Sequence, residues 1–184
     1  MCTLDNANGD RYTLDFSSDL AICSPLVHDR HKLQPSETLP PMPGQRLQRG
    51  VARALRQFDF VCIEELVPTP GLRVDVMALG PKGEVWIVEC KSSRADFRAD
   101  QKWHGYLEWC DRFFWAVGGD FPVEVLPDGS GLMLADAYDA EIIRMSPETP
   151  LAPARRKVML QKFARHAASR LHAYRDPGVA SLIL

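Results

Sequence analysis

Two acids and a lysine on adjacent predicted strands have the residue types of a metal-dependent hydrolytic site. Asp75 stands in the apolar segment LRVDVMALG, and Glu89 and Lys91 stand in EVWIVECK, which follows after PKG. Burying an unpaired charge in such surroundings costs several kcal/mol, so something must compensate the acids. A divalent cation would compensate both, and oxygen ligands suit Mg²⁺ or Mn²⁺. Lys91 would then hold a phosphate oxygen or orient the attacking water.

The turn between the two strands predicts which residues face each other. PKG suits a three-residue hairpin loop whose glycine has a positive φ. Counting outward from this loop puts Asp75 opposite Glu89, with Cα atoms roughly 4.5–5.5 Å apart and both side chains on one face. Lys91 follows two residues later and is predicted on that face. The alternative is an acid–base–acid cluster on a solvated face, but the long apolar stretches in both strands argue against it.

The surrounding elements have a regular order. Leu47, Val51, Leu55 and Phe58 predict a helix over 44–58. A capping box from Ser93 to Asp96 predicts a helix that continues to about Cys110. Core strands are expected over 58–67, 72–80, 84–91 and 112–118, a further hairpin over 131–146, and a terminal helix over 152–175.

These elements predict one α/β domain over residues 43–178. Short turns make the first three strands antiparallel, and the helical crossover makes the third and fourth parallel. The expected core is αβββαβ, a mixed sheet flanked by helices on both faces. Residues 1–42 end in the proline-rich LQPSETLPPMPG and are predicted to be a mostly disordered tail, and residues 179–184 a short C-terminal tail. Translation from Met42 is a further hypothesis, which N-terminal peptides would test.

The motif and the order of elements together resemble a known superfamily. Asp75 with Glu89-Cys90-Lys91 resembles the D…(D/E)-x-K signature of the PD-(D/E)XK nucleases, although Val74 replaces the usual proline. RVDVMALGPKGEVWIVECKSS, DFRADQKWHGY, CDRFFWAV and LMLADAYDAEIIR are similar to the MmcB-like family of bacterial DNA-repair proteins, over about residues 49–177. The resemblance implies a restriction-endonuclease-like core, DNA as the substrate and DNA-damage repair as the process.

The resemblance also implies roles for neighbouring residues. The backbone carbonyl of Cys90 is a further metal ligand in this superfamily, while its side chain is expected in the core. Lys102 and Tyr106 follow the site on the next helix, where such residues contact the scissile region. Core packing is the alternative for Tyr106, which lies on an apolar stripe.

Two more candidates come from counting around the PTPG turn. This turn places Glu65 opposite Asp75 as a possible catalytic acid, with Glu64 facing away. Arg73 would share the face of Asp75 and contact a phosphate. A plain strand acid and a solvated arginine are the respective alternatives.

Charge is distributed unevenly over the chain. The formal net charge is −2, so nucleic-acid affinity must come from local patches. Arg49 and Arg53 belong to an arginine stripe on the first helix and are candidate phosphate contacts. The terminal helix carries seven Lys and Arg and no acid. A solvated face is the alternative for both helices. The terminal helix also has an apolar seam that is predicted to be core, at Met159, Phe163, Ala167 and Leu171.

The sequence lacks the motifs of zinc sites, of hydrolase triads and of nucleotide-binding loops. The five histidines and five cysteines show no zinc spacing or hydrolase triad order, and there is no phosphate-binding glycine loop. No apolar run approaches the roughly 18 residues that span a bilayer, so no membrane partner and a cytoplasmic location are expected.

The leading hypothesis is a Mg²⁺-dependent deoxyribonuclease acting in DNA repair. Phosphodiester hydrolysis requires lowering a barrier by as much as ~20 kcal/mol, whereas one placed donor supplies roughly 3–4 kcal/mol, so a metal is the natural main contributor. The alternatives are a catalytically silent DNA-binding or recruitment module on the same fold, and an unrelated structural α/β protein. A homodimer and other DNA-repair proteins as partners are hypotheses that the sequence leaves open.

Overall fold

The computed structural model describes residues 2–5, 11–14, 43–100 and 102–178, in two units, Met1–Thr38 and Leu39–Leu184. In the first unit β1 (Cys2–Asp5) pairs antiparallel with β2 (Arg11–Leu14), a pair that the sequence did not predict. The rest of the tail predicted over 1–42, and the tail predicted over 179–184, lie outside the described residues.

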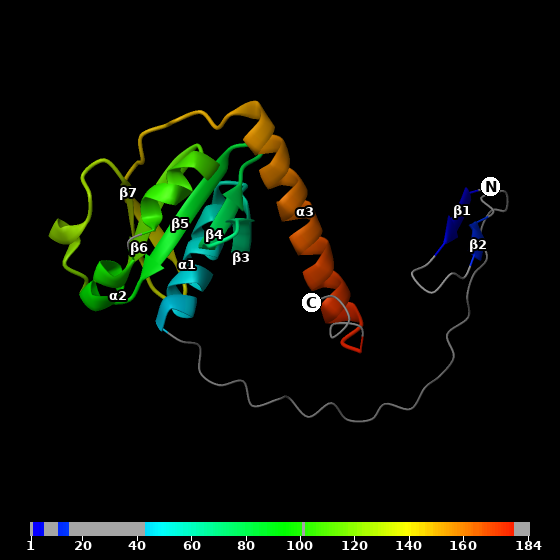
Figure 1. The fold of residues 1–184 in the computed structure, drawn as a ribbon. Coiled ribbons are helices and arrows are strands. Elements are labelled where there is room, and N and C mark those ends of the chain that lie inside the picture. The colour runs from blue at the N-terminus through cyan, green and yellow to red at the C-terminus, as the bar shows by residue number, and fades with distance from the viewer. Residues whose placement is uncertain (1, 6–10, 15–42, 101, 179–184) are drawn as a thin grey trace, which may run out of the picture. The chain divides into compact units, whose positions relative to one another are not determined.

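The second unit is an α/β domain built on a six-stranded mixed sheet (Figure 1). Its strands are β3 (Val61–Thr69), β4 (Leu72–Leu79), β5 (Val85–Lys91), β6 (Arg112–Val117), β7 (Gly131–Ala135) and β8 (Ala140–Arg144), adjacent in this order. Its helices are α1 (Pro43–Gln57), α2 (Arg94–Ala99) and α3 (Pro153–Arg175), with short 3-10 helices η1 (Trp103–Trp109) and η2 (Val123–Val125). Over the described part of the chain, no helix combines the length and apolarity needed to cross a membrane.

The strand directions confirm the predicted topology. β3, β4 and β5 are antiparallel neighbours, β5 and β6 are parallel, and β7 and β8 form the expected hairpin. The β4–β5 pairs run from Leu79↔Val85 to Val76↔Val88, which is the register counted from PKG. Gly83 has φ +84°, so the turn uses the positive φ that glycine adopts without a steric penalty.

Each face of the sheet packs against its own helices. α1 lies along one face (Figure 1), where Leu47, Val51 and Leu55 pack against alternate residues of the strands such as Val76 and Val88. η1 and the start of α3 cover the other face. The core there is a second apolar cluster that includes Met77, Ile87, Phe113, Trp115 and Met159. The sheet is therefore buried between two layers, as predicted.

The helix after β5 is interrupted, which corrects the prediction of one continuous helix to about Cys110. Ser93 caps α2 through a bond from the Asp96 amide to its hydroxyl, so the predicted N-cap is confirmed, while the Asp96 carboxylate accepts the amide of Ser92, one residue before the cap. α2 ends at Ala99 and η1 begins at Trp103. Asp100 causes the break, because its carboxylate accepts the Lys102 amide and competes with helical bonding.

The outer half of α3 does not pack into the core, which corrects the predicted apolar seam. Met159 is fully buried and Phe163 is partly buried, but Ala167 is exposed and Leu171 is 56% exposed. A helix of 23 residues is about 35 Å long. α3 is therefore longer than the part of the domain that it covers, and its second half extends past the edge strand β3 (Figure 1).

Candidate active site

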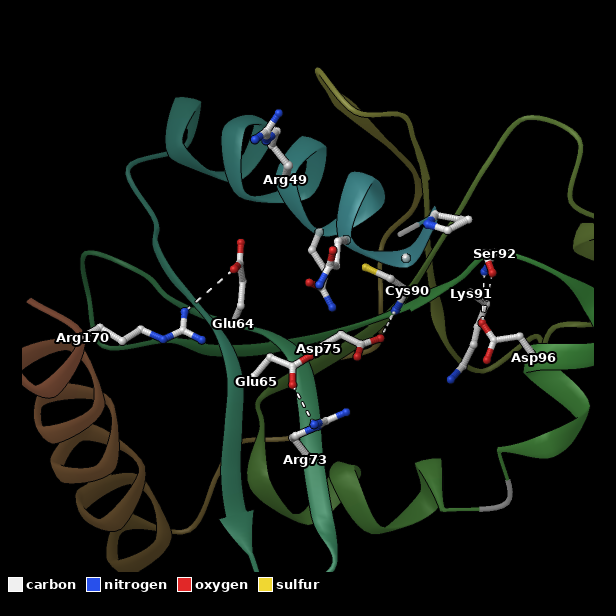
Figure 2. Close-up of a pocket in the computed structure, with 14 residues that line it drawn as sticks. Arg49, Glu64, Glu65, Arg73, Asp75, Cys90, Lys91, Ser92, Asp96 and Arg170 are labelled. Atoms are coloured by element: carbon white, nitrogen blue, oxygen red, sulfur yellow. Dashed lines mark hydrogen bonds and ion pairs between the residues drawn. The ribbon is translucent and has the colours of Figure 1, made fainter. Parts of the chain in front are cut away.

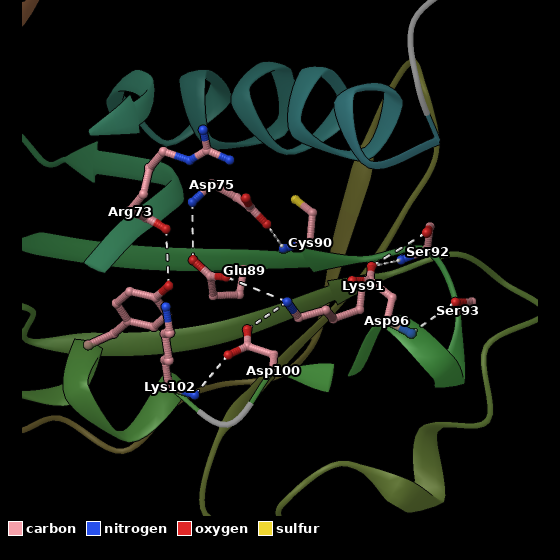
Figure 3. A network of polar contacts seen from close by, with 11 residues as sticks. Arg73, Asp75, Glu89, Cys90, Lys91, Ser92, Ser93, Asp96, Asp100 and Lys102 are labelled. Atoms are coloured by element: carbon pink, nitrogen blue, oxygen red, sulfur yellow. Dashed lines mark hydrogen bonds and ion pairs between the residues drawn. The ribbon is translucent and has the colours of Figure 1, made fainter. Parts of the chain in front are cut away.

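Asp75 and Glu89 meet where the β4–β5 ladder ends, and their carboxylates replace backbone partners there (Figure 3). The Asp75 amide donates to Glu89 Oε1 at 3.1 Å. The Cys90 amide donates to Asp75 Oδ2 at 2.8 Å. Each acid is therefore fixed by the backbone of the opposite strand, as the predicted register requires.

The two side chains do not share one face, which corrects that part of the prediction. Regular alternation stops at Asp75, because Val74 belongs to one core cluster and Val76 to the other. Opposite this point Glu65 has φ +62°, an uncommon backbone conformation for a residue other than glycine. The Asp75 carboxylate thus extends towards Cys90 on the α1 side of β5, whereas Glu89 extends to the other side (Figure 3).

Both acids are costly to ionise in this position. Burial raises the pKa of Glu89 to about 8, and the nearby charge of Asp75 adds to the shift. Burial also raises the pKa of Asp75, although the bond from the Cys90 amide opposes this. Such paired shifts are typical of functional sites, because a fold gains no stability from burying two neighbouring carboxylates.

Lys91 is held between two carboxylates on the Glu89 side of β5 (Figure 3). Its amine lies 2.7 Å from Asp100 Oδ2 and 3.7 Å from Glu89 Oε2, and its side chain is 8% exposed. Burial lowers the pKa of Lys91, but the hydrogen bond to Asp100 and the charge of Glu89 more than offset this and leave it above the ordinary value. The lysine is therefore charged and its position is fixed.

A cavity of about 900 Å³ opens on the Asp75 side of this network (Figure 2). Asp75 and Cys90 form part of its lining, together with the acids Glu64, Glu65 and Asp96. Three arginines also line it, namely Arg49 from α1, Arg73 from β4 and Arg170 from α3. The cavity therefore presents acids close to arginines, an arrangement that suits an anionic substrate held next to a cation.

The counted pairing of Glu65 with Asp75 agrees with the β3–β4 register, but Glu65 binds Arg73 instead of Asp75. Glu65 Oε2 lies 2.8 Å from Arg73 Nη1 in an exposed ion pair. Glu64, predicted to face away, also lines the cavity and lies 3.8 Å from Arg170. The positive φ of Glu65 explains why neighbouring residues border one space.

The remaining candidates lie at different distances from the acids. The Tyr106 hydroxyl donates to the Arg73 carbonyl at 3.0 Å, and the ring is buried, which supports a packing role. Lys102 is exposed at the start of η1, and its amide donates to Asp100. Arg49 lines the cavity, whereas the Arg53 guanidinium lies 5.9 Å from the centre of the Tyr138 ring.

Two residues that bear on the site were not among the sequence-based candidates. Asp100 stood inside an expected helix, where its low helix propensity was the available signal. Gln48 is a buried polar residue of α1 that lines the cavity. The sequence indicates that Gln48 faces the core through its helical spacing, because it lies three and seven residues before the core residues Val51 and Leu55.

The donor set fits Mg²⁺ by its chemistry. Within the described ranges, no group of three or more His, Cys, Asp or Glu could hold a metal ion. Mg²⁺ does not require such a group, because it commonly binds one or two carboxylates and retains several waters. Asp75 Oδ1 accepts no hydrogen bond from the described residues, and a cation would relieve the cost of ionising buried Glu89.

Comparisons with known proteins place the chain in a family. A search of curated proteins found no match. A solved structure of a protein of unknown function from Silicibacter pomeroyi is 71% identical, with a TM-score of 0.74, and the match covers 76% of this chain and 95% of that one. The family model for DNA repair protein MmcB-like matches residues 38–178. The chain, with its six-stranded sheet and its acids at the end of the β4–β5 ladder, belongs to the MmcB-like family of DNA repair proteins.

Proposed function

We propose that this protein is a Mg²⁺- or Mn²⁺-dependent DNA nuclease of the PD-(D/E)XK type that acts in DNA repair. The observation that carries the proposal is the meeting of Asp75 and Glu89 at the end of one hairpin, with Lys91 beside them and a cavity alongside. Membership of a DNA repair family supports DNA as the substrate. The two side chains extend to different sides of β5, but both carboxylates stay at the end of one ladder, because the Asp75 amide holds Glu89 Oε1 and the Cys90 amide holds Asp75 Oδ2.

Asp75 and Glu89 would hold the metal, together with the main-chain carbonyl of Cys90. The bound ion supplies charge stabilisation and a water of lowered pKa. Both carboxylates are restrained by backbone amides, so they are positioned before the substrate arrives. Such preorganisation is the main contribution that a protein makes to this kind of chemistry.

Lys91 supplies a fixed positive charge near the reacting phosphate. Its bond to Asp100 keeps the amine charged, and the rigid position avoids the entropic cost of ordering a flexible side chain. Asp100 thus acts through Lys91 as a positioning residue. The arginines that line the cavity would bind the flanking phosphates, with Arg49 and Arg73 on the α1 and β4 walls.

A DNA-binding module without turnover is the second candidate. Two observations favour it. Lys91 is already neutralised by Asp100, and no group of three metal-binding side chains is present in the described residues. A module of this kind would retain the arginine-lined cavity and lose the need for a bound cation.

One cleavage experiment separates the two candidates. The full chain is incubated with Mg²⁺, Mn²⁺ or EDTA on plain, gapped, flapped and branched DNA, alongside Lys91→Ala and the matched control Lys82→Ala. Lys82 lies in the exposed β4–β5 turn, far from the acids. The nuclease proposal predicts metal-dependent cleavage that Lys91→Ala lowers by at least about 100-fold and Lys82→Ala leaves unchanged. A wild type that binds DNA but cuts none of the forms with either metal supports the silent module.

A further inference from the structure

Gln48 is a buried polar residue without a partner among the described residues. It comes from α1, is 6% exposed and borders the cavity that Asp75 lines. Its amide forms no hydrogen bond with any residue that the structure describes. The amide nitrogen and oxygen are not enclosed by protein atoms, although the rest of the residue is buried, so the amide opens onto the cavity. A group bound in the cavity can therefore bond to the Gln48 amide in place of water.

The surroundings of Gln48 favour an anion as that partner. Pro43, Gly44 and Gln45, at the N-terminal end of α1, line the same cavity. This end carries the positive pole of the helix, and the first turn contains no acid to neutralise it. Arg49 follows Gln48 directly, lines the cavity and has no hydrogen bond or ion pair with the described residues. A donor amide, a helix N-terminus and an uncommitted guanidinium thus border one space.

The acids of the cavity are already engaged, which argues against a cation at this wall. Glu65 pairs with Arg73, and Glu64 lies within ion-pair distance of Arg170. Asp96 accepts the Ser92 amide at 3.2 Å at the α2 end of the cavity. Asp75 is bound to the Cys90 amide, on the opposite strand and not on α1. The α1 wall itself contributes no carboxylate.

We propose that the first two turns of α1 form a phosphate subsite, in which the Gln48 side-chain amide and the Arg49 guanidinium donate to one phosphate group of a bound nucleic-acid strand. The subsite lies across the cavity from the candidate metal ligands, so it would hold a phosphate next to the one that is cleaved. It rests on the proposed function only for the identity of the polymer.

A binding experiment without metal tests the subsite independently of catalysis. The probes are fluorescein-labelled single-stranded and duplex oligonucleotides, and the affinity of the full chain is measured by fluorescence anisotropy in EDTA. Gln48→Met keeps the length of the side chain and removes the donor. Arg49→Gln removes the charge at the cavity, and its matched control is Arg56→Gln, an exposed arginine of the same helix that does not line the cavity.

Gln48→Met and Arg49→Gln are each expected to weaken binding by about 10-fold, and Arg56→Gln by less than about twofold. Gln48→Met should unfold at about the wild-type temperature, because the Gln48 amide makes no hydrogen bond to the described residues that the substitution could remove. Wild-type affinity in Gln48→Met, or equally weakened binding in Arg49→Gln and Arg56→Gln, would overturn the subsite.

Gln48→Glu distinguishes a phosphate from a metal as the partner. A phosphate subsite predicts weaker DNA binding in this variant, both in EDTA and in Mg²⁺, because the new carboxylate repels the anion. Tighter binding that appears only when Mg²⁺ is added would show that position 48 ligates a cation and would overturn the proposal. Absence of cleavage by the wild type, with these binding differences intact, would remove the nuclease proposal and leave the subsite in place.

Discussion

At the scale of single residues, the candidate site buries ionisable side chains whose charged forms do not stabilise the fold. Glu89 is 2% exposed and lies near the charge of Asp75, and its pKa is raised to about 8. An apolar or neutral residue of the same size would stabilise the sheet more. Under the proposed function this cost would be the stability given up for a metal ligand, and it can be measured.

Glu89→Gln is expected to stabilise the metal-free protein in alkaline solution and to abolish cleavage. The folded-state pKa of about 8 lies above the ordinary value of 4.5, so wild-type stability falls as the pH rises through this window. The variant lacks this titration and can still accept the Asp75 amide. Its advantage in the free energy of unfolding should be small near pH 4.5 and reach on the order of 5 kcal/mol above about pH 8.

Urea unfolding in EDTA at several pH values measures this difference. The control is Glu108→Gln, which removes an exposed acid from the surface. An advantage for Glu89→Gln that is independent of pH would contradict the assignment of the shift to Glu89.

The sequence predicted the register of these residues but not the direction of each side chain. PKG determines the pairing because a three-residue loop with glycine at positive φ allows one register, which Val76↔Val88 confirms. The interruption at Asp75 depends on the positive φ of Glu65 across the strand pair. A two-residue alternation rule cannot anticipate such a conformation, because tertiary packing holds it in place.

At the scale of elements, α1 is held against the β7–β8 turn by a glycine. A Cβ atom at Gly50 would contact the carbonyl oxygens of Asp136 and Asp139 well inside van der Waals distance. Backbone carbonyls cannot move aside as a flexible side chain can. The helix that carries Gln48 and Arg49 is therefore positioned by a close backbone approach at its centre.

Gly50→Ala should destabilise the protein by about 1–2 kcal/mol, even though alanine is the better helix former. The helix propensity gain is roughly 0.5–1 kcal/mol, and overpacking costs about 1–3 kcal/mol. Gly44→Ala is the matched control in the same helix, because nothing lies within 4 Å of its added Cβ. Thermal unfolding should show a lower Tm for Gly50→Ala and an unchanged or higher Tm for Gly44→Ala.

A buried ion pair joins the start of α3 to the sheet. Asp111 accepts both guanidinium nitrogens of Arg156 at 2.6 and 2.8 Å, together with the amides of Val85 and Leu151. Burial raises the pKa of Asp111, but these four bonds more than offset it and lower the pKa below its ordinary value. The carboxylate therefore stabilises the fold above its ordinary pKa, and this stabilisation is lost as the pH falls below that value.

Asp111→Asn is expected to destabilise the protein by about 2–3 kcal/mol at neutral pH, a value reduced from the 3–5 kcal/mol of fully buried pairs because Arg156 is partly exposed. The difference from the wild type should shrink below about pH 4, because the Asp111 carboxyl of the unfolded chain takes up a proton there while the folded-state carboxyl, with its lowered pKa, is protonated only at still lower pH. Asp128→Asn, at a fully exposed acid, is the control. Denaturant titrations at neutral and acid pH would contradict this account if the deficit of Asp111→Asn stayed constant.

Helix boundaries were the least predictable elements. The apolar stripe from Trp103 to Cys110 has helical spacing, which favours one long helix. The break depends on Asp100 bonding both to the Lys102 amide and to the Lys91 amine, and the second partner lies on a different element. A contact between elements of this kind leaves no periodic signal in the sequence.

At the scale of the whole molecule, positive charge is concentrated on two helices of a net-acidic chain. The formal net charge is −2, while α1 lacks acids and α3 carries seven Lys and Arg. Several of these bases are committed within the fold, since Arg156 binds Asp111 and Arg155 binds Glu108. Arg49 and Arg53 are among those that remain exposed.

Replacing Arg49 and Arg53 by Gln should flatten the salt dependence of duplex binding. The slope of log K against log salt becomes shallower by about 0.9 for every phosphate that the protein no longer neutralises, so the double variant should differ from the wild type by up to about 1.8. Lys82→Gln, one charge at the opposite end of β5, should leave the slope unchanged. Binding titrations across a range of salt concentrations measure this, and a slope equal to that of the wild type would remove α1 as a phosphate-binding element.

The outer half of α3 gives the domain an appendage that it does not need in order to fold. Tyr174 and Leu171 are 85% and 56% exposed, and the helix has one fully enclosed residue, Met159, near its start. Shortening the chain after residue 165 should therefore leave the melting temperature of the body almost unchanged. The shortened protein also lacks Arg170, which lines the cavity near Glu64, so weaker DNA binding without a lower melting temperature would assign a binding role to the outer half of α3.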